Sequence, residues 1–177
     1  MLILKIIGSL CITGATTLYA GGLVNELTCR INTLKALKHS FNVLKGELRF
    51  GVETLPAAFM HVGERCSVGQ ETVRDFFWNM GGQLQGEGEC SLREVWEKEA
   101  KSLAAKSHLD GKECDNLVRV ADCLGYLDIA QQMNNIDLYL ESIDEDIMSL
   151  SEKYTDNCRM YMGLGVMAGL FLTIILI

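Results

Sequence analysis

The sequence predicts an all-α protein, an antiparallel bundle of about six helices whose first and last helices continue into a hydrophobic segment at each end of the chain. Apolar residues recur every three or four positions over long stretches, which is the spacing of one helix face. A single proline and 7% aromatic residues among 177 residues argue against a β-protein with many tight turns. Lys5 is the only charged residue among residues 1–24, and residues 160–177 carry none.

These two ends, one with a single charged residue and one with none, are long enough to cross a membrane. An α-helix rises about 1.5 Å per residue, and the hydrocarbon core of a bilayer is about 30 Å thick. We therefore expect transmembrane helices at 1–24 and 160–177, on either side of a helical domain at 25–159. The alternative for the first segment is a signal peptide cleaved after Ala20, which makes the chain an exported protein anchored by its C-terminal helix.

Basic side chains near the two segments favour one orientation. Arg30 and Lys38 follow the first segment, Lys153 and Arg159 precede the second, and only Lys5 lies on the outer flank. Lys and Arg close to membrane segments are enriched on the cytoplasmic side. The central domain is therefore expected to be cytoplasmic, in a protein of the cell membrane.

The central domain begins with an apolar stripe that runs on from the first hydrophobic segment. Its members are Leu27, Ile31, Leu34, Leu37, Phe41, Leu44 and Leu48. The stripe predicts a helix that ends at Phe50-Gly51. A second helix is expected to start around Thr54, because Pro56 suits the first turn of a helix.

Four further helix starts carry the spelling of a capping box, an acceptor side chain followed three positions later by Glu or Gln. They are Ser67-x-x-Gln70, Ser91-x-x-Glu94, Asp110-x-x-Glu113 and Asp128-x-x-Gln131. Gly81-Gly82 and the run Gly86–Gly88 indicate the loosest connection, between the third and fourth helices.

The last helix has the clearest pattern, with apolar residues alternating at spacings of four and three. They are Ile129, Met133, Ile136, Leu140, Ile143, Ile147, Leu150 and Tyr154. The first and last helices of the domain thus leave the membrane on the same side, each with an apolar seam, and are expected to pair antiparallel. Packing within one chain is the favoured interpretation of the seam, and pairing between chains is the alternative.

Several classes of function are disfavoured by composition and by missing motifs. A net charge of −7 is a poor match for nucleic-acid phosphates. The seven cysteines form no CxxC pair and have no zinc-ligand spacing, and no phosphate-binding loop or nucleophile motif occurs. We expect no catalytic, cofactor-binding or metal-binding residue, no cofactor and no small-molecule substrate.

Acidic residues are concentrated in the last part of the domain. Five of them are Asp137, Glu141, Asp144, Glu145 and Asp146. This cluster is interpreted either as a solvated helix face or as a docking surface for a basic partner.

Short motifs along the whole chain resemble the stage III sporulation protein AB family. The run Leu44–Gly51 (LKGELRFG) resembles a family motif, in which Leu48 and Phe50 of this chain replace the more usual Ile and Tyr. Val95-Trp96 matches a Val-Trp pair of the family, and Leu124–Gln132 (LGYLDIAQQ) is similar to its L-G-x-x-D-x-x-x-Q signature. The glycine-containing hydrophobic tail is similar as well.

This resemblance implies a function that composition alone does not suggest. Proteins of the family belong to a channel assembled between mother cell and forespore during endospore formation, and they are similar to the platform protein of type II secretion systems. The implied function is a non-enzymatic membrane platform in the mother-cell membrane around the forespore, which couples a cytoplasmic secretion-type ATPase to membrane channel components. The implied partners are this ATPase and the other channel proteins, with a homo-oligomer as a further option.

Two carboxylates near the turn between the first and second helices are the candidate partner-binding residues. Glu47 and Glu53 have no structural role that the sequence pattern can identify. Charged residues near a turn that lack such a role are reasonable candidates for contact with a partner protein.

Overall fold

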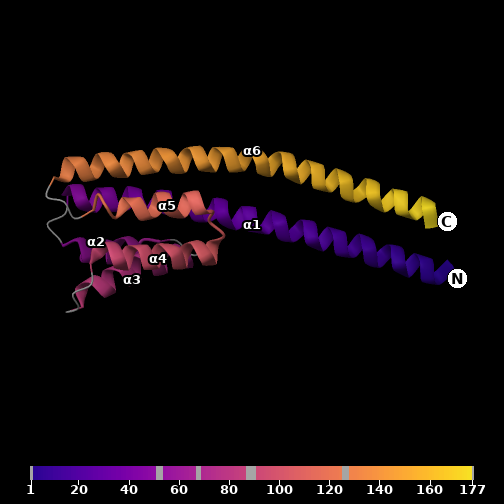
Figure 1. The fold of residues 1–177 in the computed structure, drawn as a ribbon, viewed down its shortest axis with the longest axis horizontal. Coiled ribbons are helices and arrows are strands. Elements are labelled where there is room, and N and C mark those ends of the chain that lie inside the picture. Colours follow the sequence, from indigo (N-terminus) through magenta and orange to yellow (C-terminus); the bar gives the residue numbers. More distant parts are fainter. Residues whose placement is uncertain (1, 51–53, 67–68, 87–90, 125–127, 177) are drawn as a thin grey trace. The chain divides into compact units, whose positions relative to one another are not determined.

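The computed structural model describes the backbone of residues 2–50, 54–66, 69–86, 91–124 and 128–176, and side chains within these ranges from residue 25 to 154 and at Met167. The described chain contains six α-helices and no strand. They are α1 (Leu2–Phe50), α2 (Leu55–Glu64), α3 (Glu71–Gln85), α4 (Leu92–Ser107), α5 (Gly111–Val120) and α6 (Ile129–Leu176) (Figure 1). The expected all-α fold of about six helices is confirmed.

The chain divides into two compact units. One is a helical domain at Cys29–Ile147, and the other consists of Met1–Thr28 together with Met148–Ile177. Within the part of the chain whose side chains are described, no helix is long and apolar enough to cross a membrane. The expected membrane segments, 1–24 and 160–177, lie almost entirely outside that part, so they stay predictions.

Most of the helices whose starts were predicted from the sequence begin at the expected residue. Asp110 forms a complete capping box, in which its carboxylate accepts a hydrogen bond from the Glu113 backbone N–H (2.8 Å) and the Glu113 carboxylate accepts from the Asp110 backbone N–H (2.9 Å). Asp128 accepts a hydrogen bond from the Ala130 backbone N–H at the start of α6 (2.9 Å). Thr54 and Ser91 lie at the N-caps of α2 and α4, without a side-chain cap bond.

Two expectations about glycines and helix starts were wrong. The third helix begins at Glu71 and not near Ser67, because Gly69 has φ of +90° and cannot be part of a right-handed helix. Gly81 and Gly82 lie inside α3 rather than in a connection.

Gly81 has a packing role at the contact of α3 with α2. A Cβ atom at this position would lie 2.9 Å from the Pro56 carbonyl oxygen and 3.2 Å from the Met60 backbone nitrogen. The missing side chain therefore allows the two helix backbones to approach closely. At Gly82 a Cβ atom would meet nothing within 4 Å.

The core is built around Trp96 of α4, which is fully buried. Its ring lies 6.2 Å from Phe41 of α1, 5.6 Å from Phe59 of α2 and 5.1 Å from Phe76 of α3, measured between centroids. The indole N–H donates a hydrogen bond to the Leu117 carbonyl oxygen of α5 (2.8 Å). One side chain thus joins five helices.

The helices α1 and α6 run antiparallel within the helical domain, as expected. Lys38 donates hydrogen bonds to Asp144 (2.6 Å), and Lys45 donates to Asp137 (2.6 Å to Oδ2). The seam residues of both helices are buried: Leu37, Phe41, Leu44, Ile136, Leu140 and Ile143. Phe41 contacts Tyr139 across the seam, with ring centroids 4.8 Å apart.

Ile129 departs from the expected seam, because it is 54% exposed. The Lys38–Asp144 and Lys45–Asp137 ion pairs define the antiparallel register of α1 and α6. In this register Ile129 of α6 would face position 53. Helix α1 ends at Phe50, before that level, so no turn of α1 covers Ile129.

The contact at Gly81 predicts opposite effects for two neighbouring substitutions. Gly81→Ala is expected to lower the free energy of unfolding by about 1–3 kcal/mol, because backbone atoms of α2 must move to admit the Cβ atom. Gly82→Ala is expected to raise it by up to about 1 kcal/mol, because alanine favours an open helix position over glycine. Urea unfolding followed by circular dichroism measures both, and equal effects would contradict the close packing of α2 on α3.

Candidate functional site

The helical domain has two ends that the chain defines. At the near end, Cys29 begins the domain and Ile147 closes it; at the far end, α1 ends at Phe50 and α6 begins at Ile129 (Figure 1). The Lys45–Asp137 ion pair holds α1 and α6 together close to the far end. Two runs that are far apart in the sequence therefore meet at the far end. They are the described parts of Leu44–Gly51 and Leu124–Gln132.

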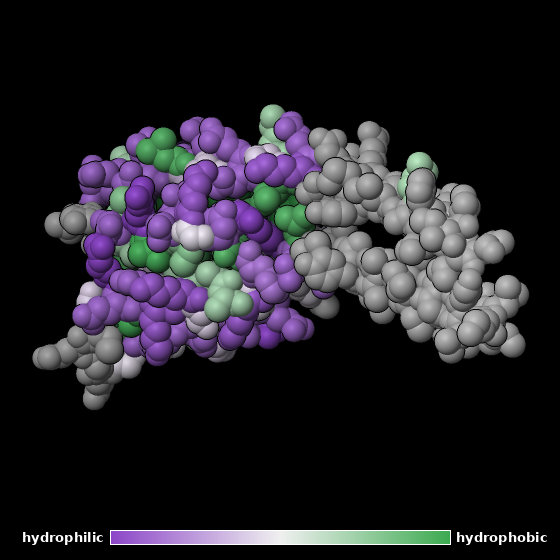
Figure 2. All heavy atoms as spheres, turned by 45° about the vertical axis from the view of Figure 1, so that its right-hand side comes forward, coloured by the Kyte–Doolittle hydropathy of each residue, from purple (hydrophilic) through white to green (hydrophobic). Residues whose placement is uncertain are grey.

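Exposed apolar side chains mark the far end. Phe50 is 80% exposed, more than any other large apolar residue among those described, and Ile129 is 54% exposed. The guanidinium of Arg49 lies 5.5 Å from the centroid of the Phe50 ring. Figure 2 shows a face of the domain on which hydrophilic residues dominate and hydrophobic areas are small. A solvated aromatic ring at a helix end is thus a candidate for contact with a partner protein.

Glu47 does have a structural role that the sequence pattern could not reveal. Its carboxylate lies 3.4 Å from the guanidinium of Arg65 and 3.9 Å from Nδ1 of His61, and its side chain is 21% exposed. It therefore links the C-terminal part of α1 to α2. Glu53, the other candidate, lies outside the described residues, so its role stays a prediction.

Sequence reasoning missed Phe50 as a site residue, although a signal was present. The α1 stripe passes through Leu44 and Leu48, and Phe50 follows Leu48 by only two positions. On a helix this places Phe50 away from the buried stripe. An aromatic residue off the apolar face, at the last position before a stop, could have been identified as exposed.

At the near end, Arg30 joins α1 to the first turn of α5. Its Nε donates to the Glu113 carboxylate (2.8 Å), and its guanidinium also pairs with Asp110. Burial would raise the pKa of the Asp110 carboxyl, but the backbone N–H of Glu113 and the charge of Arg30 outweigh it and hold that pKa below its ordinary value. Burial would lower the pKa of the Arg30 guanidinium, but the carboxylates of Glu113 and Asp110 outweigh it and raise that pKa above its ordinary value. The capping box of α5 and the Arg30 ion pairs thus form one network.

Every buried polar side-chain atom in the described part of the chain has a hydrogen-bond partner. Glu99 of α4 is 8% exposed, and its carboxylate accepts hydrogen bonds from the side-chain amides of Asn79 (3.1 Å) and Gln83 (2.8 Å) of α3. Burial raises the pKa of the Cys114 thiol, which keeps it protonated at neutral pH. Among the residues with described side chains, no group of three His, Cys, Asp or Glu is placed to hold a metal ion.

These features define the class of the protein as an all-α domain in which several ion pairs join different helices, among them Arg30–Glu113, Lys38–Asp144 and Lys45–Asp137. The family model described as stage III sporulation protein AB matches residues 5–177. The chain belongs to this family, and membership supports a role in sporulation.

Two known proteins agree with the family assignment. The stage III sporulation protein AB of Bacillus subtilis (strain 168) is 25% identical over 173 residues, which cover 98% of this chain and 99% of that protein. A solved structure of stage III sporulation protein AB (SpoIIIAB) has a TM-score of 0.63 at 20% identity, covering 72% of this chain and 97% of that one. The second similarity shows that the two share a fold.

The Arg30 network predicts a pH-dependent loss of stability in Arg30→Gln. Near neutral pH we expect the free energy of unfolding to fall by about 1–3 kcal/mol, because the buried Glu113 carboxylate loses the cation that pairs with it. The pKa of Asp110 is lower in the folded chain than in the unfolded chain. The ionised carboxylate therefore stabilises the fold above the unfolded pKa of about 3.9, and this stabilisation is lost as the pH falls through the folded pKa.

The difference in the free energy of unfolding between wild type and Arg30→Gln is therefore expected to become smaller below about pH 4. Urea unfolding at a series of pH values measures it. Arg74→Gln is the control, because Arg74 pairs with its exposed neighbour Asp75 and should change stability by less than about 1 kcal/mol. A difference that is unchanged at acid pH would contradict the assigned network.

Proposed function

We propose that this chain is a non-enzymatic membrane platform of the channel between mother cell and forespore. In this role its helical domain lies in the mother-cell cytoplasm, held by hydrophobic segments at both ends of the chain. It couples a cytoplasmic secretion-type ATPase to channel components in the membrane. Family membership supports the sporulation role, and the resemblance to type II secretion platform proteins supports the coupling to an ATPase.

The observation that carries this proposal is the exposed far end of the domain. Two of the sequence runs that resemble family motifs, Leu44–Gly51 and Leu124–Gln132, lead to this end, and Phe50 stands where the family more usually has tyrosine. Its ring is 80% exposed, although nothing in helix formation requires an aromatic residue there. Aromatic residues are among the commonest anchors of protein interfaces. We assign the ATPase contact to Phe50 and Ile129.

Phe50 and Ile129 lie at the same end of the helical domain. From Cys29 to Phe50 helix α1 rises roughly 30 Å along the domain. The Glu47–Arg65 pair steadies α2 beside the last turns of α1 and so supports the surface that carries Phe50.

The contact predicts that Phe50→Ser and Ile129→Ser each weaken binding to the purified ATPase of the same assembly by about tenfold or more. Binding is measured with the full-length chain in detergent, and heat-resistant spores are counted in a spore-forming host that carries each variant. The physical reason is the loss of apolar area that only the partner covers.

Leu138→Ser is the matched control, because Leu138 is 56% exposed on α6 but about 13 Å from Ile129 along the helix. It should bind the ATPase like the wild type. Equal binding by all three variants, with helicity unchanged, would refute the far end as the contact.

The exported protein with a cleaved signal peptide is the alternative from a different class. The platform predicts that the purified chain retains its N-terminus and stays in the membrane after carbonate extraction. Mass spectrometry of the mature chain measures the first property. A mass that corresponds to cleavage after Ala20 would favour the exported protein.

A further inference from the structure

We propose that this chain forms a two-fold symmetric homodimer, in which the exposed face of α1 in each copy packs on the exposed face of α6 in the other copy. Every residue that carries this proposal belongs to the helical domain, Cys29–Ile147. The dimer depends neither on the ATPase contact nor on membrane anchoring.

Helix α1 has a second stripe of residues at spacings of three and four, beside its buried seam. Its members are Asn32, Lys35, His39, Asn42, Gly46 and Arg49. All of them are exposed except Gly46, which is half-buried. The stripe contains two cationic side chains, Lys35 and Arg49, and no acidic one. This face of α1 is therefore positively charged.

Helix α6 has an outer stripe of the opposite charge. Its members are Gln131, Asn134, Leu138, Glu141 and Glu145, and all of them are exposed. The stripe contains two carboxylates and no basic residue. The neighbouring Asp137 and Asp144 pair with lysines of α1, whereas Glu141 and Glu145 form no ion pair among the described side chains. Their charges are thus available to a partner.

The two outer stripes lie on the same side of the domain. Two ion pairs hold α1 and α6 side by side. Phe41 of α1 and Tyr139 of α6 are both buried and in contact, so each helix turns its seam towards one common core. The sides of α1 and α6 that face away from this core form one outer face, with a positive half on α1 and a negative half on α6.

Such a face is complementary to itself. A two-fold axis parallel to the helices places α1 of each copy on α6 of the other copy, so that each positive stripe meets a negative one. A two-fold axis across the helices would place α1 on α1 and α6 on α6, with like charges opposed. Charge therefore favours the axis parallel to the helices.

This arrangement brings the oppositely charged side chains together. Rotation about an axis parallel to the helices leaves each residue at its own level, and Lys38 is level with Asp144 within one chain. Lys35 of one copy and Glu145 of the other therefore differ in level by only about 3 Å. Both side chains are exposed and can reach across this distance. The dimer has two such contacts, one on each side of the axis.

An apolar contact lies between the charged ones. Leu138 is 56% exposed, and its level falls midway between Asn42 and Gly46 of the other copy. A Cβ atom at Gly46 would meet nothing within 4 Å, so the space above this backbone is open. Leu138 of one copy can thus pack on the bare backbone of α1 in the other.

The face is large enough for a specific dimer. From Asn32 to Arg49 helix α1 rises about 26 Å, and two helices side by side are about 20 Å wide. Each copy therefore contributes about 500 Å², and the two copies together about 1,000 Å². This total reaches the size that separates specific interfaces from most crystal contacts.

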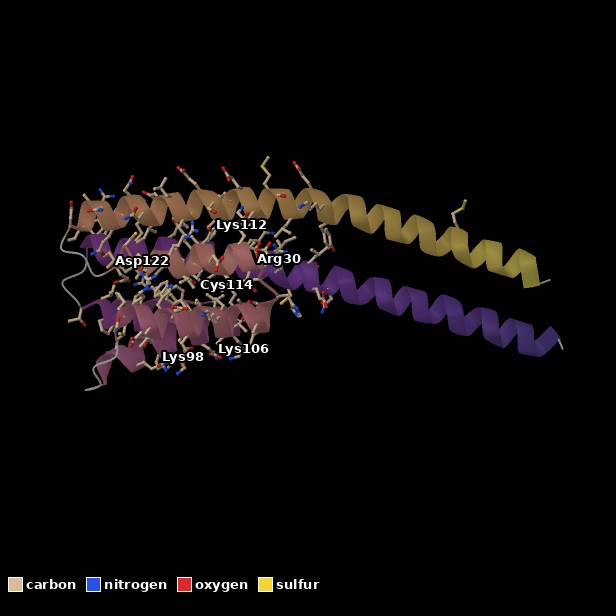
Figure 3. All side chains as sticks on the ribbon, viewed as in Figure 1. Arg30, Lys98, Lys106, Lys112, Cys114 and Asp122 are labelled. Carbon is tan, nitrogen blue, oxygen red and sulfur yellow. The ribbon has the colours of Figure 1, made fainter. Side chains whose placement is uncertain are left out.

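The test reverses charges in the full-length chain in detergent. Lys35→Glu and Glu145→Lys each place like charges opposite one another at both contacts of the dimer. Each variant is expected to raise the dissociation constant of the dimer by about tenfold or more, measured by analytical ultracentrifugation. Lys98→Glu is the matched control, because Lys98 is exposed on α4, on the side of the domain away from α6 (Figure 3). It should dimerise like the wild type, and circular dichroism checks that each variant is folded.

Mixing the two charge-reversed variants tests the geometry itself. A mixed dimer of Lys35→Glu with Glu145→Lys has opposite charges at both contacts again. Its dissociation constant is therefore expected to lie within about threefold of the wild-type value. A wild-type chain that stays monomeric, variants that dimerise like the wild type, or a mixture that does not restore the dimer would each overturn the proposal.

The dimer and the ATPase contact can fail separately. Leu138→Ser is expected to weaken the dimer by about threefold or more, because it removes the apolar contact. The affinity of one chain for the ATPase should not change, since Phe50 and Ile129 are intact in this variant. A wild-type chain that binds the ATPase as a monomer would refute the dimer alone, and a dimer that does not bind the ATPase would refute the proposed function alone.

Discussion

The packing of the helical domain depends on the burial of Trp96. Its ring and indole N–H connect α4 to four other helices, and Phe41, one of its ring partners, carries the contact on to α6 through Tyr139. Aromatic pairs of this kind contribute beyond the area they bury, and the buried indole N–H requires its hydrogen bond. The positions of both ends of the helical domain therefore depend on this buried core.

Patterns within one helix predicted most of the fold from the sequence. The α1 stripe, the Asp110 capping box and the Pro56 start depend on neighbours in the chain, so their spacing is visible in the letters. Gly81 was misjudged because the reason for glycine there is an approach of α2, which no local pattern records. Ile129 was expected to be buried, but its burial depended on the length of α1, which ends at Phe50.

The candidate site was less predictable for the same reason. Glu47 has a structural partner in Arg65, the residue that follows α2, and only the folded chain brings these two side chains together. Phe50 could have been identified from its position off the stripe, but its convergence with the start of α6 required the antiparallel register of α1 and α6. Residues that act between helices are found only when the register is known.

The register itself is specified by two kinds of contact that act together. Lys38 and Lys45 are seven residues apart, as are Asp144 and Asp137, so sliding α6 by seven residues would preserve one of the two ion pairs. Exposed ion pairs are also weak, and they alone would not exclude such a shift. The same shift would place Phe41 opposite Gln132 or Asp146 instead of Tyr139, and would separate the aromatic rings. The aromatic core thus selects one register, which keeps the far end at a fixed height above the near end.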